Sequence, residues 1–448
     1  MGSKILNLLI EDLKYIKTMT LKTYEFVLSA LKILIKGTKF ENHVYSVGGC
    51  ERDRILGNEI KDIDLVIDSI PNGGIKFAEY LYENHYLIHE PVIYENFGTV
   101  MFRLIDFPDI ELEAVHTRKE TYRGDSRKPE TAFGTIEEDC QRRDFTINAI
   151  YRNISTGETL DLNGNSRRDL TDKSIRTCGD PNIIFEEDPL RILRAIRFKH
   201  RLGYYYDIET YRGMINYVDR LSIISQERIT DEFSKILCGN TPFDALHEME
   251  KLGMLPYIFP NISKGDLKQI MELKQLIYLR YSKCNLVIRL AILFRNFEED
   301  TIKQIIRDMK YPNNVADDII FLHKFTVDYR SYNNDGQEFY LPNIRKAMYF
   351  SKTSEKFKLL CDYLEAIGRY GNAIYTTSIF DIGDIMYGYK LGVNGDDIME
   401  KFNIKPGPII KDLLDSLLES AFVFPETYNK KDCCLMRVEG ILYHKLQD

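Results

Sequence analysis

Apolar residues follow two different spacings along the first part of the chain. Residues 4–37 carry apolar positions at helical spacing, which predicts one or two helices that end at Gly37. Short β-branched runs at 43–47 and 65–67 predict strands, and residues 75–90 return to helical spacing. Mixed helices and strands of this kind are typical of an α+β domain.

After residue 240 the spacing of apolar residues is helical only, and prolines interrupt it. This pattern predicts an all-α second half. The expected helices are 242–252, 264–277, 284–297, 300–309, 313–328, 342–349, 354–371, 377–390, 394–401 and 407–421.

Length and composition narrow the class of protein. A chain of 448 residues exceeds a single core and predicts two to four domains. No run of about eighteen apolar residues occurs, so no membrane span is expected. Acidic residues stand where an export signal would be apolar, and the eight cysteines form no C-x-x-C pair; a cytoplasmic location is expected. The net charge of −8 argues weakly against nucleic acid, but the local clustering of basic residues decides binding.

Two aspartates precede the second predicted strand as Asp62-Ile63-Asp64. Residues two apart in a strand point to one face, so the carboxylates of Asp62 and Asp64 project together. Such a pair repels unless a cation lies between, and Mg²⁺ prefers hard oxygen ligands. A polar pair on a solvated strand face is the alternative interpretation.

The segment before these aspartates contains groups suited to an anion. Gly48 and Gly49 can bring backbone N–H groups close to a phosphate because no Cβ intervenes. Arg52 follows three residues later and can place a guanidinium on the same anion.

A third carboxylate is expected from the alternating segment 110–115. Glu111 and Glu113 share one face of this predicted strand, and either can lie beside Asp62 and Asp64. A solvated strand face is an equally good interpretation. The next residues, 118–140, are polar and rich in charge, which predicts one long loop.

Two later segments combine arginine with acidic residues. Residues 142–150 read RRDFTINAI, where an arginine can bind phosphate and a carboxylate can bind ribose hydroxyls. Residues 186–198 read EEDPLRILRAIRF, and Asp188 followed by proline needs no function beyond a helix N-cap. The arginines in this segment recur every three residues and would repel one another unless phosphate or facing carboxylates lie nearby. They are Arg191, Arg194 and Arg197.

Taken together and in this order, these motifs resemble those of the class II tRNA nucleotidyltransferases, the CCA-adding enzymes and their bacterial poly(A) polymerase relatives. The resemblance covers about residues 44–240. It implies a small polymerase-β-like nucleotidyltransferase head, with a mixed sheet and helices, followed by an all-α neck, body and tail. The implied divisions are N-terminal helices (1–40), head (41–170), neck (171–240), body (241–340) and a tRNA-binding tail (341–448).

The resemblance also implies a reaction and roles for named residues. The reaction is transfer of C, C and A from CTP and ATP to the 3′ end of tRNA, with release of pyrophosphate. Asp62 and Asp64 would hold two Mg²⁺ ions, with Glu113 as a better third ligand than Glu111. Triphosphate or sugar contacts are implied for five residues, with Asp144 near the 2′-hydroxyl: Gly48, Gly49, Arg52, Arg143 and Asp144.

The neck would select the base with protein side chains. Asp188 would accept from the exocyclic amino group of cytosine or adenine, and Arg191 would donate to the adjacent ring nitrogen, with Arg194 and Arg197 in support. Uracil and guanine present the opposite groups at these places. A segment Gln226–Leu237 resembles the last neck motif, and Glu227 and Arg228 are expected to hold neck helices together.

Two alternatives and one departure remain open. A poly(A) polymerase or a partial CC- or A-adding enzyme would share the same motifs, and a non-catalytic RNA-binding protein could be built on the same head. Relatives usually have small or apolar residues where this chain has Cys50-Glu51. Glu51 would weaken triphosphate binding unless its side chain points away.

Overall fold

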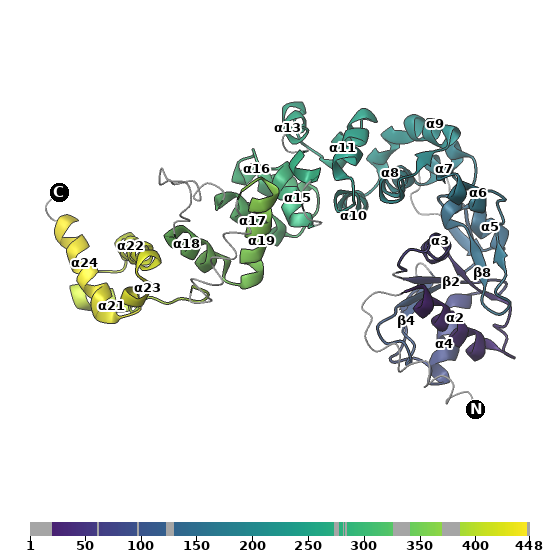
Figure 1. Ribbon diagram of the computed structural model, residues 1–448, viewed down its shortest axis with the longest axis horizontal. Coiled ribbons are helices and arrows are strands. Elements are labelled where there is room, and N and C mark those ends of the chain that lie inside the picture. Colours follow the sequence, from purple (N-terminus) through teal and green to yellow (C-terminus); the bar gives the residue numbers. More distant parts are fainter. Residues whose placement is uncertain are drawn as a thin grey trace. The chain divides into compact units, whose positions relative to one another are not determined.

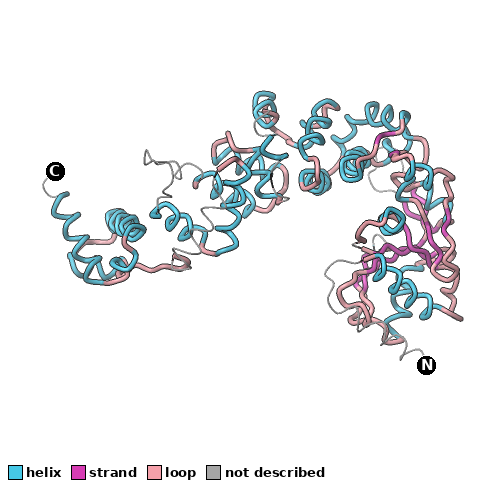
Figure 2. The backbone as a smooth tube through the Cα atoms, viewed as in Figure 1, coloured by secondary structure: helices cyan, strands magenta, loops and turns pink. Residues whose placement is uncertain are grey.

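The computed structural model describes residues 20–60, 62–95, 98–121, 130–272, 277–280, 282, 285–325, 341–369 and 386–445. The chain forms two compact units, Met1–Ile236 with Glu248–Tyr257, and Leu237–His247 with Ile258–Asp448. Every strand in the described part of the chain belongs to the first unit (Figure 2). The finer division into head, neck, body and tail stays a prediction.

A seven-stranded sheet forms the centre of the first unit, in the order β3-β4-β5-β2-β1-β8-β9. The pairing of β2 with β5 is parallel and the other pairings are antiparallel, so the sheet is mixed, as predicted. Its strands are β1 (Val44–Val47), β2 (Ile63–Ile67), β3 (Val92–Tyr94), β4 (Thr99–Phe102), β5 (Leu112–His116), β8 (Tyr151–Asn153) and β9 (Thr159–Leu160).

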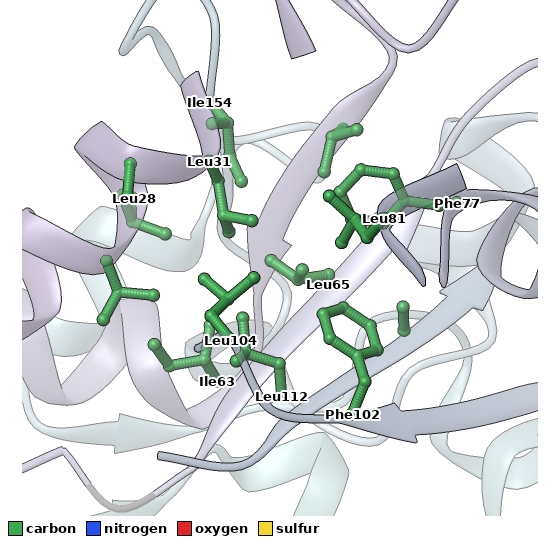
Figure 3. Close-up of a cluster of buried hydrophobic side chains, with 14 of the residues drawn as sticks. Leu28, Leu31, Ile63, Leu65, Phe77, Leu81, Phe102, Leu104, Leu112 and Ile154 are labelled. Carbon is green, nitrogen blue, oxygen red and sulfur yellow. The ribbon is translucent and has the colours of Figure 1, made fainter. Parts of the chain in front are cut away.

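The main apolar core lies on one face of this sheet, under α2 (Leu21–Ile35) and α4 (Gly73–Glu83). Figure 3 shows Leu28 and Leu31 of α2 and Phe77 of α4 gathered around Leu65 of β2. Helix α4 approaches β5 so closely that a Cβ on Gly74 would lie 2.7 Å from the carbonyl oxygen of Ala114. Because this face is filled with apolar side chains, the polar residues of β2 and β5 are left for the opposite face.

The segment 118–140 is not one long loop, and that prediction was wrong. It contains a hairpin of β6 (Arg118–Thr121) and β7 (Glu130–Phe133), followed by α5 (Ile136–Gln141). A capping box begins α5, because the Thr135 hydroxyl accepts from the N–H of Glu138 while the Glu138 side chain accepts from the N–H of Thr135. Arg123, Arg127 and Lys128 lie outside the described residues.

Short helices and a two-stranded parallel sheet follow the central sheet within the first unit (Figure 1). These elements are η3 (Thr146–Asn148), α6 (Ser166–Thr171), β10 (Ser174–Ile175), α7 (Pro181–Glu187), α8 (Leu190–Leu202), β11 (Tyr205–Tyr206), α9 (Ile208–Tyr217), η4 (Val218–Ile223) and α10 (Gln226–Leu237). Helix α10 ends at the predicted residue.

The second unit is helical wherever it is described, as predicted. Helices α11 and α12 cross the boundary between the two units. The remaining bounds are α11 (Pro242–Lys251), α12 (Leu255–Ile258), α13 (Lys264–Ile270), α15 (Leu286–Leu293), α16 (Glu299–Asp308), α17 (Asn313–Lys324), α18 (Leu341–Ser351), α19 (Ser354–Ala366), α21 (Gly395–Phe402), α22 (Pro408–Val423), α23 (Pro425–Tyr428) and α24 (Lys431–Lys445).

Several results in this half differ from the predictions. The short helices α12 and α23 were not predicted. Helices α13 and α15 are shorter than expected. The predicted helix 377–390 lies mostly outside the described residues. Helix α24 was not predicted, because its apolar residues do not gather on one face and Gly440 interrupts them. No described helix is both long and apolar enough to span a membrane.

Candidate active site

The predicted carboxylates lie on the face of the sheet opposite the main core. Asp64 of β2 stands directly beside Glu113 of β5 in the parallel register, and the exposed Asp62 immediately precedes β2. Glu111 lies before β5 and forms an ion pair with Arg103 at 3.1 Å. The structure thus places Asp64 and Glu113 side by side, with Asp62 just before β2, and pairs Glu111 with Arg103.

The charges of these three residues influence one another. Burial, and then the charge of Asp62, raise the pKa of Asp64, against the guanidinium groups of Arg143, Arg52 and Arg194. Burial, Asp64 and Asp62 likewise raise the pKa of Glu113. These shifts indicate like charges held close together, which a cation would relieve.

The carboxylates do not form a closed ligand shell. Within the described ranges, no three His, Cys, Asp or Glu side chains are grouped closely enough to hold a metal ion. The oxygen donors nevertheless match the chemistry of a hard divalent cation, and Mg²⁺ keeps several waters and substrate oxygens in its shell. The donor set therefore fits a cation that the substrate helps to bind.

A carboxylate and a guanidinium both approach Gly48 on the side where a Cβ would stand. A Cβ on this residue would be 3.1 Å from Oδ2 of Asp64 and 3.7 Å from Nη1 of Arg143. Its φ of +85° is also one that side chains other than glycine rarely adopt. Gly49 begins α3 (Gly49–Leu56), so the free N–H groups at the start of this helix lie at the same place. The N–H groups and Arg143 are suited to bind an anion such as a phosphate, and Asp64 is suited to bind a cation associated with that anion.

Asp139 and Tyr151 hold Arg143 in position. Nε of Arg143 donates to Oδ2 of Asp139 at 3.1 Å and to the hydroxyl of Tyr151 at 2.8 Å, and the Tyr151 hydroxyl donates to the same carboxylate at 2.7 Å. Burial alone would raise the pKa of Asp139, but Arg143, Arg142 and Tyr151 lower it to about 2. Asp139, which sequence reasoning missed, lies one helical turn before Arg143 and could have been found from that spacing.

Arg52 is almost fully buried and bound to protein groups. Its Nε and Nη2 donate to the two carboxylate oxygens of Asp53, and its Nη1 donates to Oδ1 of Asn148 at 2.6 Å. Its charge still acts on Asp64. A direct triphosphate contact for Arg52 stays a prediction. Asp53 was missed from the sequence, whereas Asn148 lies within the predicted segment RRDFTINAI.

Asp144 connects the RRD segment to α8. Its Oδ1 accepts from the N–H of Phe145 and from Asn148, and its Oδ2 accepts from Nε and Nη2 of Arg194 at 2.9 and 2.7 Å. Burial alone would raise the pKa of Asp144, but Arg194 and Asn148 lower it to about 2. Protein groups thus bind both carboxylate oxygens, and the predicted ribose contact stays a prediction.

A facing carboxylate neutralises the positive charge of two arginines of α8. The sequence had left open whether phosphate or carboxylates would do so. Glu232 of α10, which is 3% exposed, lies 2.7 Å from Nε of Arg197 and 3.5 Å from Nη1 of Arg194. Both arginines also lie over the ring of Phe198. Sequence reasoning missed Glu232, because its partners lie on another helix.

Asp188 and Arg191 meet at the junction of α7 and α8. Asp188 ends α7 and its Oδ1 accepts from the N–H of Leu190, so it caps α8 although the helix begins one residue later than expected. Its Oδ2 pairs with Arg228 at 2.8 Å, a link between neck helices. The buried Arg191 donates to the carbonyl oxygens of Ile184 and Arg142.

Two family models match parts of the chain between residues 44 and 265. One, described as the poly A polymerase head domain, matches residues 44–176. The other, described as a probable RNA and SrmB-binding site of polymerase A, matches residues 206–265.

Known proteins match the chain to different extents. The nucleotidyltransferase lcsQ of Purpureocillium lilacinum is 35% identical over 218 residues, which is 44% of this chain and 36% of that protein. The CCA-adding enzyme of Ligilactobacillus salivarius is 27% identical over 429 residues, 93% of this chain and 97% of that protein. The crystal structure of the Bacillus stearothermophilus CCA-adding enzyme in complex with CTP aligns with a TM-score of 0.72 at 23% identity, covering 94% and 98% of the two chains. These matches show the same fold along nearly the whole chain.

Proposed function

Because the chain belongs to the class II family of CCA-adding enzymes and poly(A) polymerases, we propose that it adds C, C and A to the 3′ end of tRNA from CTP and ATP, without a template. One observation carries the chemistry: Oδ2 of Asp64 and Nη1 of Arg143 both approach Gly48, at 3.1 and 3.7 Å from the position that a Cβ on this residue would take. The match to a CCA-adding enzyme along 93% of the chain supports the choice of substrates.

Enzymes of this family depend on divalent metal ions, and we propose Mg²⁺ at this site. Asp62, Asp64 and Glu113 would hold it, because Asp64 and Glu113 lie side by side on β2 and β5 and Asp62 immediately precedes β2. A cation would relieve the repulsion that raises the pKa of Asp64 and of Glu113. When bound, the metal lowers the pKa of the attacking 3′-hydroxyl and stabilises the leaving pyrophosphate.

The triphosphate would bind at the start of α3. The N–H groups of Gly48 and Gly49 and the guanidinium of Arg143 supply donors and positive charge at one place. Asp139 and Tyr151 would keep that guanidinium aimed, since they bind its Nε and leave Nη1 directed toward Gly48.

The base would be selected at the junction of α7 and α8. Each oxygen of Asp188 has a second lone pair beyond those used by Leu190 and Arg228, and it can accept from an exocyclic amino group. Arg191 follows three positions later. Each of its Nη groups donates one hydrogen to a backbone carbonyl, of Ile184 or Arg142, and keeps a second N–H that could donate to the base. A mismatched base would leave buried groups unpaired, at roughly 1–3 kcal/mol per group.

Incorporation of nucleotides into tRNA that lacks its last three residues tests the function. Purified protein with CTP, ATP and Mg²⁺ is expected to add three nucleotides and stop. A long run of A from ATP alone would identify a poly(A) polymerase, and arrest after two C residues a partial enzyme. An absence of incorporation would favour a non-catalytic RNA-binding protein.

A further inference from the structure

A fully buried acidic residue lies in the first turn of the helix that follows Gly48. Glu51 of α3 has no exposed side-chain surface. Carboxylates are almost never fully buried unless several partners satisfy them. The partners of Glu51 therefore indicate what this unusual residue does.

Three donors from different parts of the head bind this carboxylate. Oε1 accepts from the hydroxyl of Tyr24 on α2 and from the hydroxyl of Ser46 on β1. Oε2 accepts from Nε of Arg54 within α3, at 2.7 Å. Tyr24 and Ser46 are themselves fully buried. The carboxylate thus points into the protein and joins α2, β1 and α3.

The hydroxyl of Tyr24 stays protonated and therefore donates a hydrogen bond in this cluster. Burial, together with Cys50 and Glu51, raises the pKa of Tyr24 well above its usual range, so the hydroxyl keeps its proton. Helix α2 is attached to the sheet a second time, because Glu25 accepts from both Nη atoms of Arg152 on β8 at 2.7 and 3.0 Å. Because α2 is itself bound to β8, the hydrogen bond from Tyr24 fixes the position of the Glu51 carboxylate relative to the sheet.

We propose that Glu51, held by Tyr24 and Ser46, is a positioning residue for the nucleoside triphosphate. This inference rests on the proposed function. Glu51 lies three positions after Gly48, whose backbone must keep its place beside Asp64 and Arg143 to present its amides. Tying the first turn of α3 to α2 and β1 fixes the direction of those amides before the ligand arrives.

Tyr24→Phe and Glu51→Gln test this role, with Tyr80→Phe as the matched control. The hydroxyl of Tyr80 also binds α2, at the carbonyl oxygen of Leu34, but it does not touch α3. Each test variant is expected to raise KM for CTP and ATP about tenfold, because a hydrogen bond to a charged group is worth about that factor. The control should leave KM unchanged, and kcat should change less than about twofold in all three.

Amide hydrogen exchange at residues 48–52 gives a second measurement that needs no turnover. Faster exchange there in Tyr24→Phe, but not in Tyr80→Phe, is expected. Equal KM values for Tyr24→Phe, Tyr80→Phe and wild type, with only Tm lowered, would overturn the inference. If Glu51→Gln does not fold, Tyr24→Phe still decides the question. A wild-type protein that incorporates no nucleotide would instead refute the proposed function, while the exchange measurement would still report on the cluster.

Discussion

Side chains at the candidate site are each held by a partner of opposite charge or by a hydroxyl. Arg143 is bound by Asp139 and Tyr151, and Asp144 by Arg194. Asp62 and Glu113 differ, because the neighbours that shift the pKa of Glu113 most, after burial, are other carboxylates. A structural ion-pair network would not leave acids facing acids, and this imbalance supports the proposal that a ligand supplies positive charge here.

Replacement of Asp64 should separate activity from stability. Asp64→Asn is expected to lower kcat at least about a thousandfold, because metal charge stabilisation is worth several kcal/mol. Its Tm should be equal to or above that of wild type, since a carboxyl whose pKa is raised by folding destabilises the fold at neutral pH. Nucleotide incorporation and thermal unfolding measure the two effects. A lower Tm with activity retained would contradict the assignment.

The two glutamates of the predicted strand provide a matched pair. Glu113→Gln is expected to lower kcat about a hundredfold or more, because Glu113 lies beside Asp64 in the strand register. Glu111→Gln should change kcat less than about twofold, since Glu111 forms only an exposed pair with Arg103. Steady-state kinetics of both variants at saturating CTP distinguish the roles. The opposite result would move the third ligand to Glu111.

At the scale of elements, ion pairs connect the RRD segment to the neck helices. Asp144 binds Arg194 of α8, and Glu232 of α10 binds Arg194 and Arg197. The neck arginines therefore depend on carboxylates that come from two different elements. Buried pairs of this kind are costly to break singly, because the remaining charge stays buried.

Acid should loosen this connection within a defined range of pH. Folding lowers the pKa of Asp144 to about 2 from an unfolded value near 3.8, so its contribution is complete above the unfolded value and is lost as pH falls toward 2. Asp144→Asn should lower the free energy of unfolding by at least about 2 kcal/mol at pH 6. That difference should shrink between pH 4 and pH 2 in urea unfolding curves. A difference that does not depend on pH would show that the carboxylate charge is not what matters.

Elements with strong periodic patterns were predictable, and those defined by polar contacts were not. Strands β1 and β2 and helix α10 follow from their apolar residues. Helix α5 was mistaken for loop because its sequence is charged, although the capping box at Thr135 and Glu138 was readable. At the site, the motif residues could be named from the sequence, but Glu232 could not, since only the fold brings it to Arg197.

At the scale of the whole molecule, an acidic protein is proposed to bind a polyanion. A net charge of −8 leaves tRNA binding to local groups of basic residues. In the proposed tail, Lys430 and Arg437 are exposed, and they flank the start and middle of α24. Long-range repulsion between the acidic protein and the RNA would oppose binding, so direct phosphate contacts must supply the affinity.

The salt dependence of tRNA binding tests the tail. Each phosphate that a basic side chain neutralises adds roughly 0.7 to 0.9 to the slope of log Kd against log salt concentration. The double variant Lys430→Ala/Arg437→Ala should weaken tRNA binding and reduce that slope by about 1.5, while CTP binding stays unchanged. A double variant of two exposed lysines near or on α2, Lys32→Ala/Lys36→Ala, is the control and should keep the wild-type slope. Equal slopes for all three proteins would place the tRNA contacts outside this part of the chain.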